Sequence, residues 1–144
     1  MIRVPRFGSP EEAQDAFYRA FEQADLEAMM AVWADDDEIV CIHPAGPRLT
    51  GPEQVRDAWR EIFRNGPTLL FTLSEGLLHR GATLAVSCVQ ENIRTVGDEN
   101  TAHVVAATNV FVLTVGGWRM LVHHATPSAP APQPQRREQP NLLH

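Results

Sequence analysis

The sequence predicts an α+β fold in which three amino-terminal helices pack on a strongly curved antiparallel sheet that forms a cone with an internal pocket. Two observations predict this class. Apolar residues recur with helical spacing up to Asn65, and runs rich in Val, Leu, Thr and Phe follow Pro67. Short glycine-containing turns separate these runs, which favours an antiparallel meander. The runs are longer than ordinary strands, so we expect the sheet to be bulged and curved.

The first two helices have explicit start signals. Ser9 is a candidate N-cap, Pro10 suits the first helical position, and Glu12 completes a capping box. Asp25 is placed to cap a second, shorter helix, and the connection between the two is so short that we expect a helical hairpin. The apolar face of the first helix comprises Ala13, Ala16, Phe17, Ala20, Phe21 and Ala24, and that of the second comprises Leu26, Met29, Met30 and Trp33.

An acidic turn, a strand and a third helix follow. The three adjacent aspartates at 35–37 do not converge on one cation and lack the glycine and distal glutamate of a calcium loop, so we interpret them as a solvated turn. Residues 38–43 are expected to form a short apolar strand. Thr50 is the expected cap of the third helix, which ends at Asn65. Its apolar face comprises Val55, Ala58, Trp59, Ile62 and Phe63.

Four strands are expected after the helices, at residues 68–79, 82–96, 102–115 and 118–126. In the third of them both alternating sets of side chains are apolar, so the sheet needs cover on each face. The helices cover the concave face, and a second subunit is the natural cover for the convex face. We therefore predict a homodimer formed through the sheet.

Composition and charge exclude several classes of protein. The formal net charge of −6 disfavours nucleic acid as a partner, because phosphate binding needs clustered Lys and Arg. No apolar run is long enough to span a membrane, and the amino end lacks the apolar core of a signal peptide. Cys41 and Cys88 are interpreted as buried free thiols, which fit a reducing cytosol and a cytoplasmic protein. We expect one domain over residues 1–127 and an extended or disordered Pro-rich tail over 128–144.

Several stretches of the chain carry a family resemblance. They are A-D-L-E-A-M-M-A-V-W-A-D-D-D at 24–37, I-H-P-A-G at 42–46, L-T-G-P-E-Q-V at 49–55, G-W-R at 117–119 and H-H-A-T-P at 123–127. With them the chain resembles, over residues 9–127, the nuclear transport factor 2-like superfamily, also described as a cystatin-like fold. The similarity is to its SnoaL-like polyketide cyclase and ketosteroid isomerase branches. It implies the α+β cone, but leaves the function open among isomerases, cyclases, hydratases, epoxide hydrolases and non-catalytic binding or transport modules.

The resemblance also implies positions for the catalytic groups of the isomerase branch, and this chain departs from them. The general-base aspartate of that branch precedes a proline at the end of the first strand, where this chain has His43 before Pro44. Its oxyanion tyrosine falls on Phe17, and Tyr18, one residue away, is expected on another face. Its second oxyanion donor falls on Asn109. Ketosteroid isomerisation in its familiar form is therefore not expected.

The polar residues near the predicted pocket leave alternatives open. His43 either moves a proton near neutral pH or hydrogen-bonds a backbone carbonyl or carboxylate where the strand ends. Asn109, within an apolar strand, either belongs to an internal network or presents its amide to a ligand. His123 and His124 point to opposite faces, so they cannot share one ion. Glu91 is expected at the rim or an interface, whereas on the concave side it would be a second acid–base candidate.

Two hypotheses from different classes remain. No serine-nucleophile motif, phosphate-binding loop, dinucleotide fingerprint or zinc spacing occurs, so we expect no cofactor and no metal. The first hypothesis is a cofactor-independent isomerase, cyclase or hydratase acting on a small hydrophobic carbonyl compound, with His43 as base and Asn109 as oxygen-stabilising donor. The alternative is a non-catalytic ligand-binding or dimerisation domain. The side chains expected around a ligand are Phe17, Met30, Trp33, Trp59, Phe63, Phe111 and His123.

Overall fold

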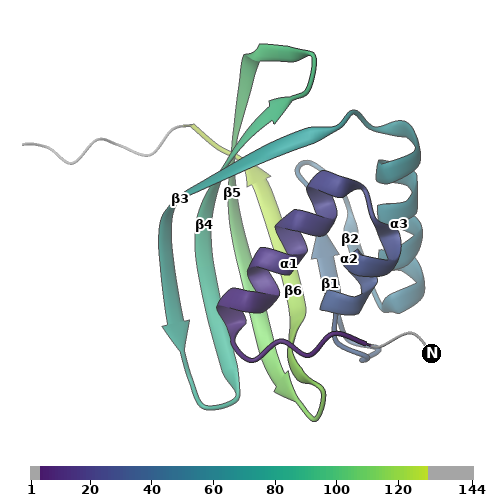
Figure 1. Cartoon of the computed structure of the whole chain (residues 1–144), viewed down its shortest axis with the longest axis vertical. Coiled ribbons are helices and arrows are strands. Elements are labelled where there is room, and N and C mark those ends of the chain that lie inside the picture. The colour runs from purple at the N-terminus through teal and green to yellow at the C-terminus, as the bar shows by residue number, and fades with distance from the viewer. Residues whose placement is uncertain (1–3, 130–144) are drawn as a thin grey trace, which may run out of the picture.

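The computed structural model describes residues 4–129, apart from the side chains of Glu99 and Thr101, and has the expected α+β class. Three helices lie against one face of a six-stranded sheet (Figure 1). The helices are α1 (Pro10–Gln23), α2 (Leu26–Val32) and α3 (Pro52–Asn65). The strands are β1 (Val40–Ile42), β2 (Arg48–Thr50), β3 (Leu69–Arg80), β4 (Leu84–Thr95), β5 (Asp98–Thr114) and β6 (Gly117–Pro127), in the spatial order β2-β1-β6-β5-β4-β3.

The helix start signals are confirmed for α1 and α2 and are wrong for α3. Ser9 accepts a hydrogen bond from the Glu12 amide, and Asp25 accepts one from the Ala28 amide. The cap of α3 is Gly51, with φ of +88° and no side-chain hydrogen bond, because Thr50 is the last residue of β2. Gly51 suits this place because glycine adopts a positive φ without strain.

The sheet is mixed and open, which corrects the expectation of an antiparallel sheet closed into a cone. Strands β3 to β6 form the expected antiparallel meander, but β1 runs parallel to β6 and pairs Cys41 with His123. Strand β1 is also shorter than expected, and β2, which the sequence did not indicate, pairs with it as a hairpin across the turn that contains Pro44 and Pro47. Strands β2 and β3 are the two edges and do not pair with each other.

Bulges interrupt the long strands as expected. The register shifts between Ser74 and Leu77 on β3 and between Val110 and Phe111 on β5. The hairpin between β4 and β5 is tighter than predicted, because Thr95 pairs with Asp98 and leaves a two-residue turn. This hairpin projects beyond the helices at the top of Figure 1.

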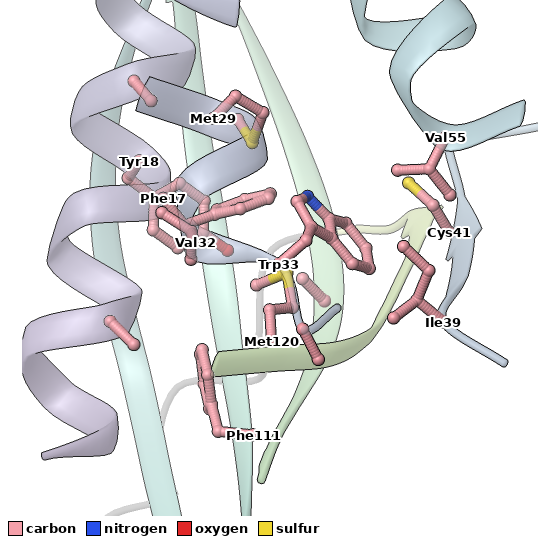
Figure 2. Close-up of a cluster of buried hydrophobic side chains, with 14 of the residues drawn as sticks. Phe17, Tyr18, Met29, Val32, Trp33, Ile39, Cys41, Val55, Phe111 and Met120 are labelled. Atoms are coloured by element: carbon pink, nitrogen blue, oxygen red, sulfur yellow. The ribbon is translucent and has the colours of Figure 1, made fainter. Parts of the chain in front are cut away.

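The core lies between the helices and the concave face of the sheet. Phe17, Trp33 and Met120 are among its buried residues, drawn from α1, the segment after α2, and β6 (Figure 2). On β5 the alternation is confirmed, because Val105, Ala107, Asn109 and Phe111 are buried whereas their neighbours are half-buried or exposed. Leu113 departs from it with 41% exposure, near the end of the strand.

None of the helices in residues 4–129 combines the length and the apolar character needed to pass through a bilayer. Strand β6 ends at Pro127, the predicted domain boundary. Residues 130–144 of the tail predicted over 128–144 lie outside the described residues.

Candidate functional site

A row of buried polar side chains crosses the concave face beneath α1. Glu91 on β4, Asn109 on β5 and His123 on β6 have exposures of 2%, 0% and 1%. Tyr18 and Gln14 of α1 face the same row, one helical turn apart. We call these five residues the polar row. Buried polar groups on a sheet otherwise lined by Val, Ala and Phe require hydrogen-bond partners, and here they supply one another.

The polar row is a continuous chain of hydrogen bonds. The Nδ2 group of Asn109 donates to Tyr18 Oη and to Gln14 Oε1, both at 3.1 Å. Asn109 Oδ1 is then the acceptor for Nδ1 of His123, at 2.6 Å. The Tyr18 hydroxyl in turn donates to Glu91 Oε2 at 2.5 Å. The amide of Asn109 is therefore at the centre of an internal network, one of the two roles expected of it.

Burial shifts the pKa of Glu91 into the range useful for catalysis. Desolvation raises the pKa of this carboxyl from 4.5 to about 7, although the hydrogen bond from Tyr18 opposes the shift. Burial and then the negative charge of Glu91 raise the pKa of Tyr18 well above its usual value. The Tyr18 hydroxyl thus remains a hydrogen-bond donor, and near neutral pH the proton that can be exchanged in this pair is on Glu91.

His43 lies directly after β1 and is half-buried against α3. Its ring meets Trp59 edge-to-face with centroids 4.7 Å apart, and its Nε2 lies 3.5 Å from Cys41 Sγ. Burial lowers the pKa of His43 to about 4. Burial, followed by the charges of His43 and His124, lowers the pKa of His123 to about 3. Both imidazoles are consequently neutral at physiological pH, and their rings are 6.4 Å apart.

The predicted ligand-contacting residues fall into separate groups. Phe17, Trp59, Phe63 and His123 pack together, with Phe21 and Phe71 among them, at ring-centroid distances between 4.5 and 6.4 Å. Met30 and Trp33 instead line a hollow of about 840 Å³ between α2, the amino-terminal segment and the β5–β6 end of the sheet. Phe111 borders a smaller hollow of about 130 Å³ next to Gln14.

A hollow of about 660 Å³ lies at the end of the concave face where β4 turns into β5. We call it the mouth hollow; its lining includes Pro44, Pro67, Leu69, Ile93, Thr95, His103, Val105 and Pro127. Glu91 pairs with Val105 and shares a face with Ile93, and Pro44 directly follows His43. None of His43, Asn109 and Glu91 lines any of the five hollows outlined in the described residues; the mouth hollow extends to Ile93 and Val105, the neighbours of Glu91 on this face.

Two expectations about this region are wrong. Tyr18 does not lie on another face: like Phe17 it is buried, and its hydroxyl bonds Asn109. Glu91 is not at a rim, because it has the same strand parity as the buried Ala85, Ser87 and Val89. That parity, together with the four-residue spacing of Gln14 and Tyr18, was available in the sequence as a signal. The expectation that His123 and His124 face opposite sides is confirmed, and His123 is the inner one.

The chain is similar to a known family and to several solved structures. A family model described as a SnoaL-like domain matches residues 11–132. A comparison with curated proteins found none that matches the chain. Several solved structures do match.

A candidate calcium/calmodulin-dependent protein kinase type II association domain from Thiobacillus denitrificans is 41% identical, with a TM-score of 0.77, covering 87% of this chain and 99% of its own. A candidate dehydratase of the NTF2-like family from Streptomyces avermitilis is 32% identical, with a TM-score of 0.74, covering 81% and 91%. A ketosteroid isomerase-like protein from Erwinia carotovora is 20% identical, with a TM-score of 0.64 and coverage of 83% and 94%, which shows a shared fold.

Proposed function

The chain belongs to the SnoaL-like family, and we propose that it is a cofactor-independent enzyme that transfers a proton on a small, largely apolar carbonyl compound. In this proposal Glu91 is the group that accepts and returns the proton. The substrate reaches Glu91 through the mouth hollow, and its apolar part contacts Ile93 and Val105. Tyr18 holds the carboxyl in place from the helix side.

The observation that carries the proposal is the buried carboxyl with a pKa of about 7. Burying an ionisable group costs free energy, and a site that serves packing alone is filled by an apolar side chain. A general base is most effective when its pKa lies near the working pH, because it is then both largely deprotonated and basic enough to take a proton. Ionisable groups with strongly shifted pKa values are typical of catalytic sites, and Ile93 and Val105, the neighbours of Glu91, line the mouth hollow.

The chemistry follows from this geometry. The Glu91 carboxylate removes a proton from the carbon next to the carbonyl, and the bonding electrons move to the carbonyl oxygen to form an enolate. Where a carbon–carbon double bond is conjugated with the enolate, return of the proton to the far carbon of that double bond gives an isomer. Loss of a hydroxyl group from the β-carbon, with the proton from Glu91 leaving in the water formed, gives a dehydrated product. The Streptomyces protein described as a candidate dehydratase supports the second course.

The test measures proton exchange without requiring the natural substrate. The protein is incubated in deuterium oxide with a panel of alkyl and cyclic ketones, and NMR follows the loss of the α-proton signals. We expect the rate of exchange to increase as the pH rises through about 7. The substitution Glu91→Gln should lower this rate by about a hundredfold or more. Gln90→Ala, on the other face of β4, is the matched control and should keep the rate. Absence of exchange with every ketone, or an unchanged rate in Glu91→Gln, would refute the proposal.

A second candidate function is assembly through the convex face of the sheet. Val40, Val122, Val110 and Val86 are aligned in register across four adjacent strands, and each is half-buried. A continuous apolar row of this kind suits a second copy of the chain. The Thiobacillus protein described as a candidate association domain supports this candidate, and the predicted homodimer is part of it.

Light scattering tests the assembly. We expect the wild type to have the mass of a dimer or larger oligomer. Val110→Asp should be a monomer, because a carboxylate among the four aligned valines would be desolvated at the interface. Val115→Asp, at a position that is 98% exposed in the β5–β6 turn, is the control and should assemble normally. A monomeric wild type at micromolar concentration would remove this candidate.

A further inference from the structure

A hydrogen-bond donor without a partner lies among the packed rings of Phe17, Phe21, Trp59, Phe63 and Phe71, next to the polar row. Trp59 is fully buried, and among the described residues its Nε1–H has no hydrogen-bond acceptor. Burial of an N–H group without an acceptor is unfavourable, and native proteins contain few such groups. Trp59 therefore needs an acceptor that the described residues do not supply.

A hydrogen-bond acceptor without a partner lies on a neighbouring ring, that of His123. Both Nδ2 hydrogens of Asn109 are used by Tyr18 and Gln14, so Oδ1 faces His123 and accepts the proton carried by Nδ1. This fixes His123 as the Nδ1–H tautomer and leaves a lone pair on Nε2, for which the described residues provide no donor. Burial keeps this imidazole neutral, so the lone pair persists at ordinary pH.

The two groups belong to neighbouring rings. The centroids of Trp59 and His123 are 6.4 Å apart with the planes tilted by 39°, and the ring of Phe17 contacts both. A hydroxyl oxygen can accept from an N–H and donate to an imidazole nitrogen at the same time. A carbonyl oxygen cannot donate and an ammonium group cannot accept, so neither satisfies both rings.

We propose that Trp59 Nε1–H and His123 Nε2 form a hydroxyl subsite, and that the substrate class is a hydroxy carbonyl compound. The assignment of the carbonyl end to Glu91 rests on the proposed function; the hydroxyl subsite does not. Binding places the hydroxyl oxygen between the two rings, where it accepts from Trp59 and donates to His123. Asn109 is a positioning residue for this subsite, because it sets the tautomer of His123.

Trp33 provides an internal control. Its Nε1 is also buried without a partner, but in the described residues its ring contacts no histidine, so no acceptor completes a hydroxyl subsite there. The presence of the acceptor on His123, and not the unpaired indole alone, is what distinguishes Trp59.

The test uses the indole signals of the ¹⁵N-labelled wild-type protein, assigned with Trp33→Phe, Trp59→Phe and Trp118→Phe. The probes are 3-hydroxybutan-2-one and 2-hydroxycyclohexanone. The methyl ethers of these two hydroxy ketones cannot donate a hydrogen bond from the ether oxygen, and butan-2-one and cyclohexanone have neither a hydroxyl nor an ether group. We expect the hydroxy ketones to move the Trp59 signal downfield and the Trp33 signal not at all. They should also bind about tenfold more tightly than the ethers and the simple ketones.

A two-bond proton–nitrogen spectrum of His123 should show the Nδ1–H tautomer, with the Nε2 signal moving when the hydroxy ketone binds. Trp59→Phe should lose the preference for the hydroxyl, whereas Trp33→Phe should keep it. The inference is overturned if no probe moves the Trp59 signal, or if simple ketones move it equally. It is also overturned if a long-lived water contacts the Trp59 N–H and stays in place when the probes are added.

The two proposals fail separately. Hydroxyl-dependent shifts of the Trp59 signal without deuterium exchange would support the hydroxyl subsite and refute the proposed enzymatic function. Deuterium exchange that depends on Glu91, without any shift of the Trp59 signal, would support the proposed enzymatic function and refute the hydroxyl subsite.

Discussion

The two faces of the same strands carry similar residue types but very different environments. Glu91, Asn109 and His123 face the helices, and Gln90, Thr108 and His124 lie one residue earlier or later on the opposite face. The inner three are buried and bonded through Tyr18 into one chain. The outer three are half-buried or exposed.

Burial, and not residue type, separates a candidate catalytic group from an ordinary surface group. On the inner face desolvation moves the pKa of Glu91 up and that of His123 down. On the outer face Gln90 and Asn92 share Ser74 in a ladder where water can replace any missing partner. The following changes test this contrast.

The largest effect is expected from Asn109→Ala. Removing this amide leaves the Nδ1–H of His123 without an acceptor and opens a cavity in the core, so we expect a loss of about 3 to 4 kcal/mol in the free energy of unfolding. Thr108→Ala, the neighbour on the outer face, should cost less than about 1 kcal/mol. Urea unfolding followed by circular dichroism measures both, and equal losses would remove the contrast between the faces.

Glu91→Gln should stabilise the protein above pH 7. The pKa of Glu91 is raised from 4.5 to about 7. The contribution of the protonated Glu91 to the free energy of unfolding is therefore fully present below pH 4.5 and is lost as the pH rises to 7. Each pKa unit corresponds to about 1.4 kcal/mol, so the neutral amide should add about 3 to 4 kcal/mol above pH 7 and much less near pH 4.5. Urea unfolding at both ends of this window checks the difference; a destabilised variant at high pH would contradict the desolvation argument.

His43→Gln should change the slope of stability against pH. The pKa of His43 is lowered from 6.5 to about 4, so its contribution is present above pH 6.5 and is lost as the pH falls toward 4. We expect the stability of the variant relative to wild type to grow by about 1 kcal/mol per pH unit on acidification through this window. Denaturant midpoints at several pH values measure it, and parallel curves for the two proteins would show that His43 titrates normally.

The smallest effect is expected from Ser74→Ala on the outer face. Its hydroxyl accepts from Asn92 at 2.9 Å and from Gln90 at 3.3 Å, but both amides can turn to water. We expect a cost of about 0.5 to 1 kcal/mol by urea unfolding. A cost comparable to that of Asn109→Ala would mean that the convex face is buried in solution, as the assembly candidate requires.

Short-range signals in the sequence predicted much of the fold. The caps at Ser9 and Asp25 depend on residues within one helical turn, and the opposite orientation of His123 and His124 follows from the two-residue period of a strand. The cap at Thr50 was wrong because a three-residue strand, β2, extends to that residue, and a strand so short has no detectable alternation.

The sequence by itself determined the class, the order of the main elements and the two-faced character of the sheet, since these depend on local periodicity and turn chemistry. The tertiary structure decided that β1 runs parallel to β6, that Met30 and Trp33 line a hollow that Trp59 does not line, and that Tyr18 meets Glu91. These depend on how α1 lies across β4, β5 and β6 and on how far the bulges bend the strands. Partners 73 and 91 residues from Tyr18 meet at its hydroxyl, and no local pattern encodes that meeting.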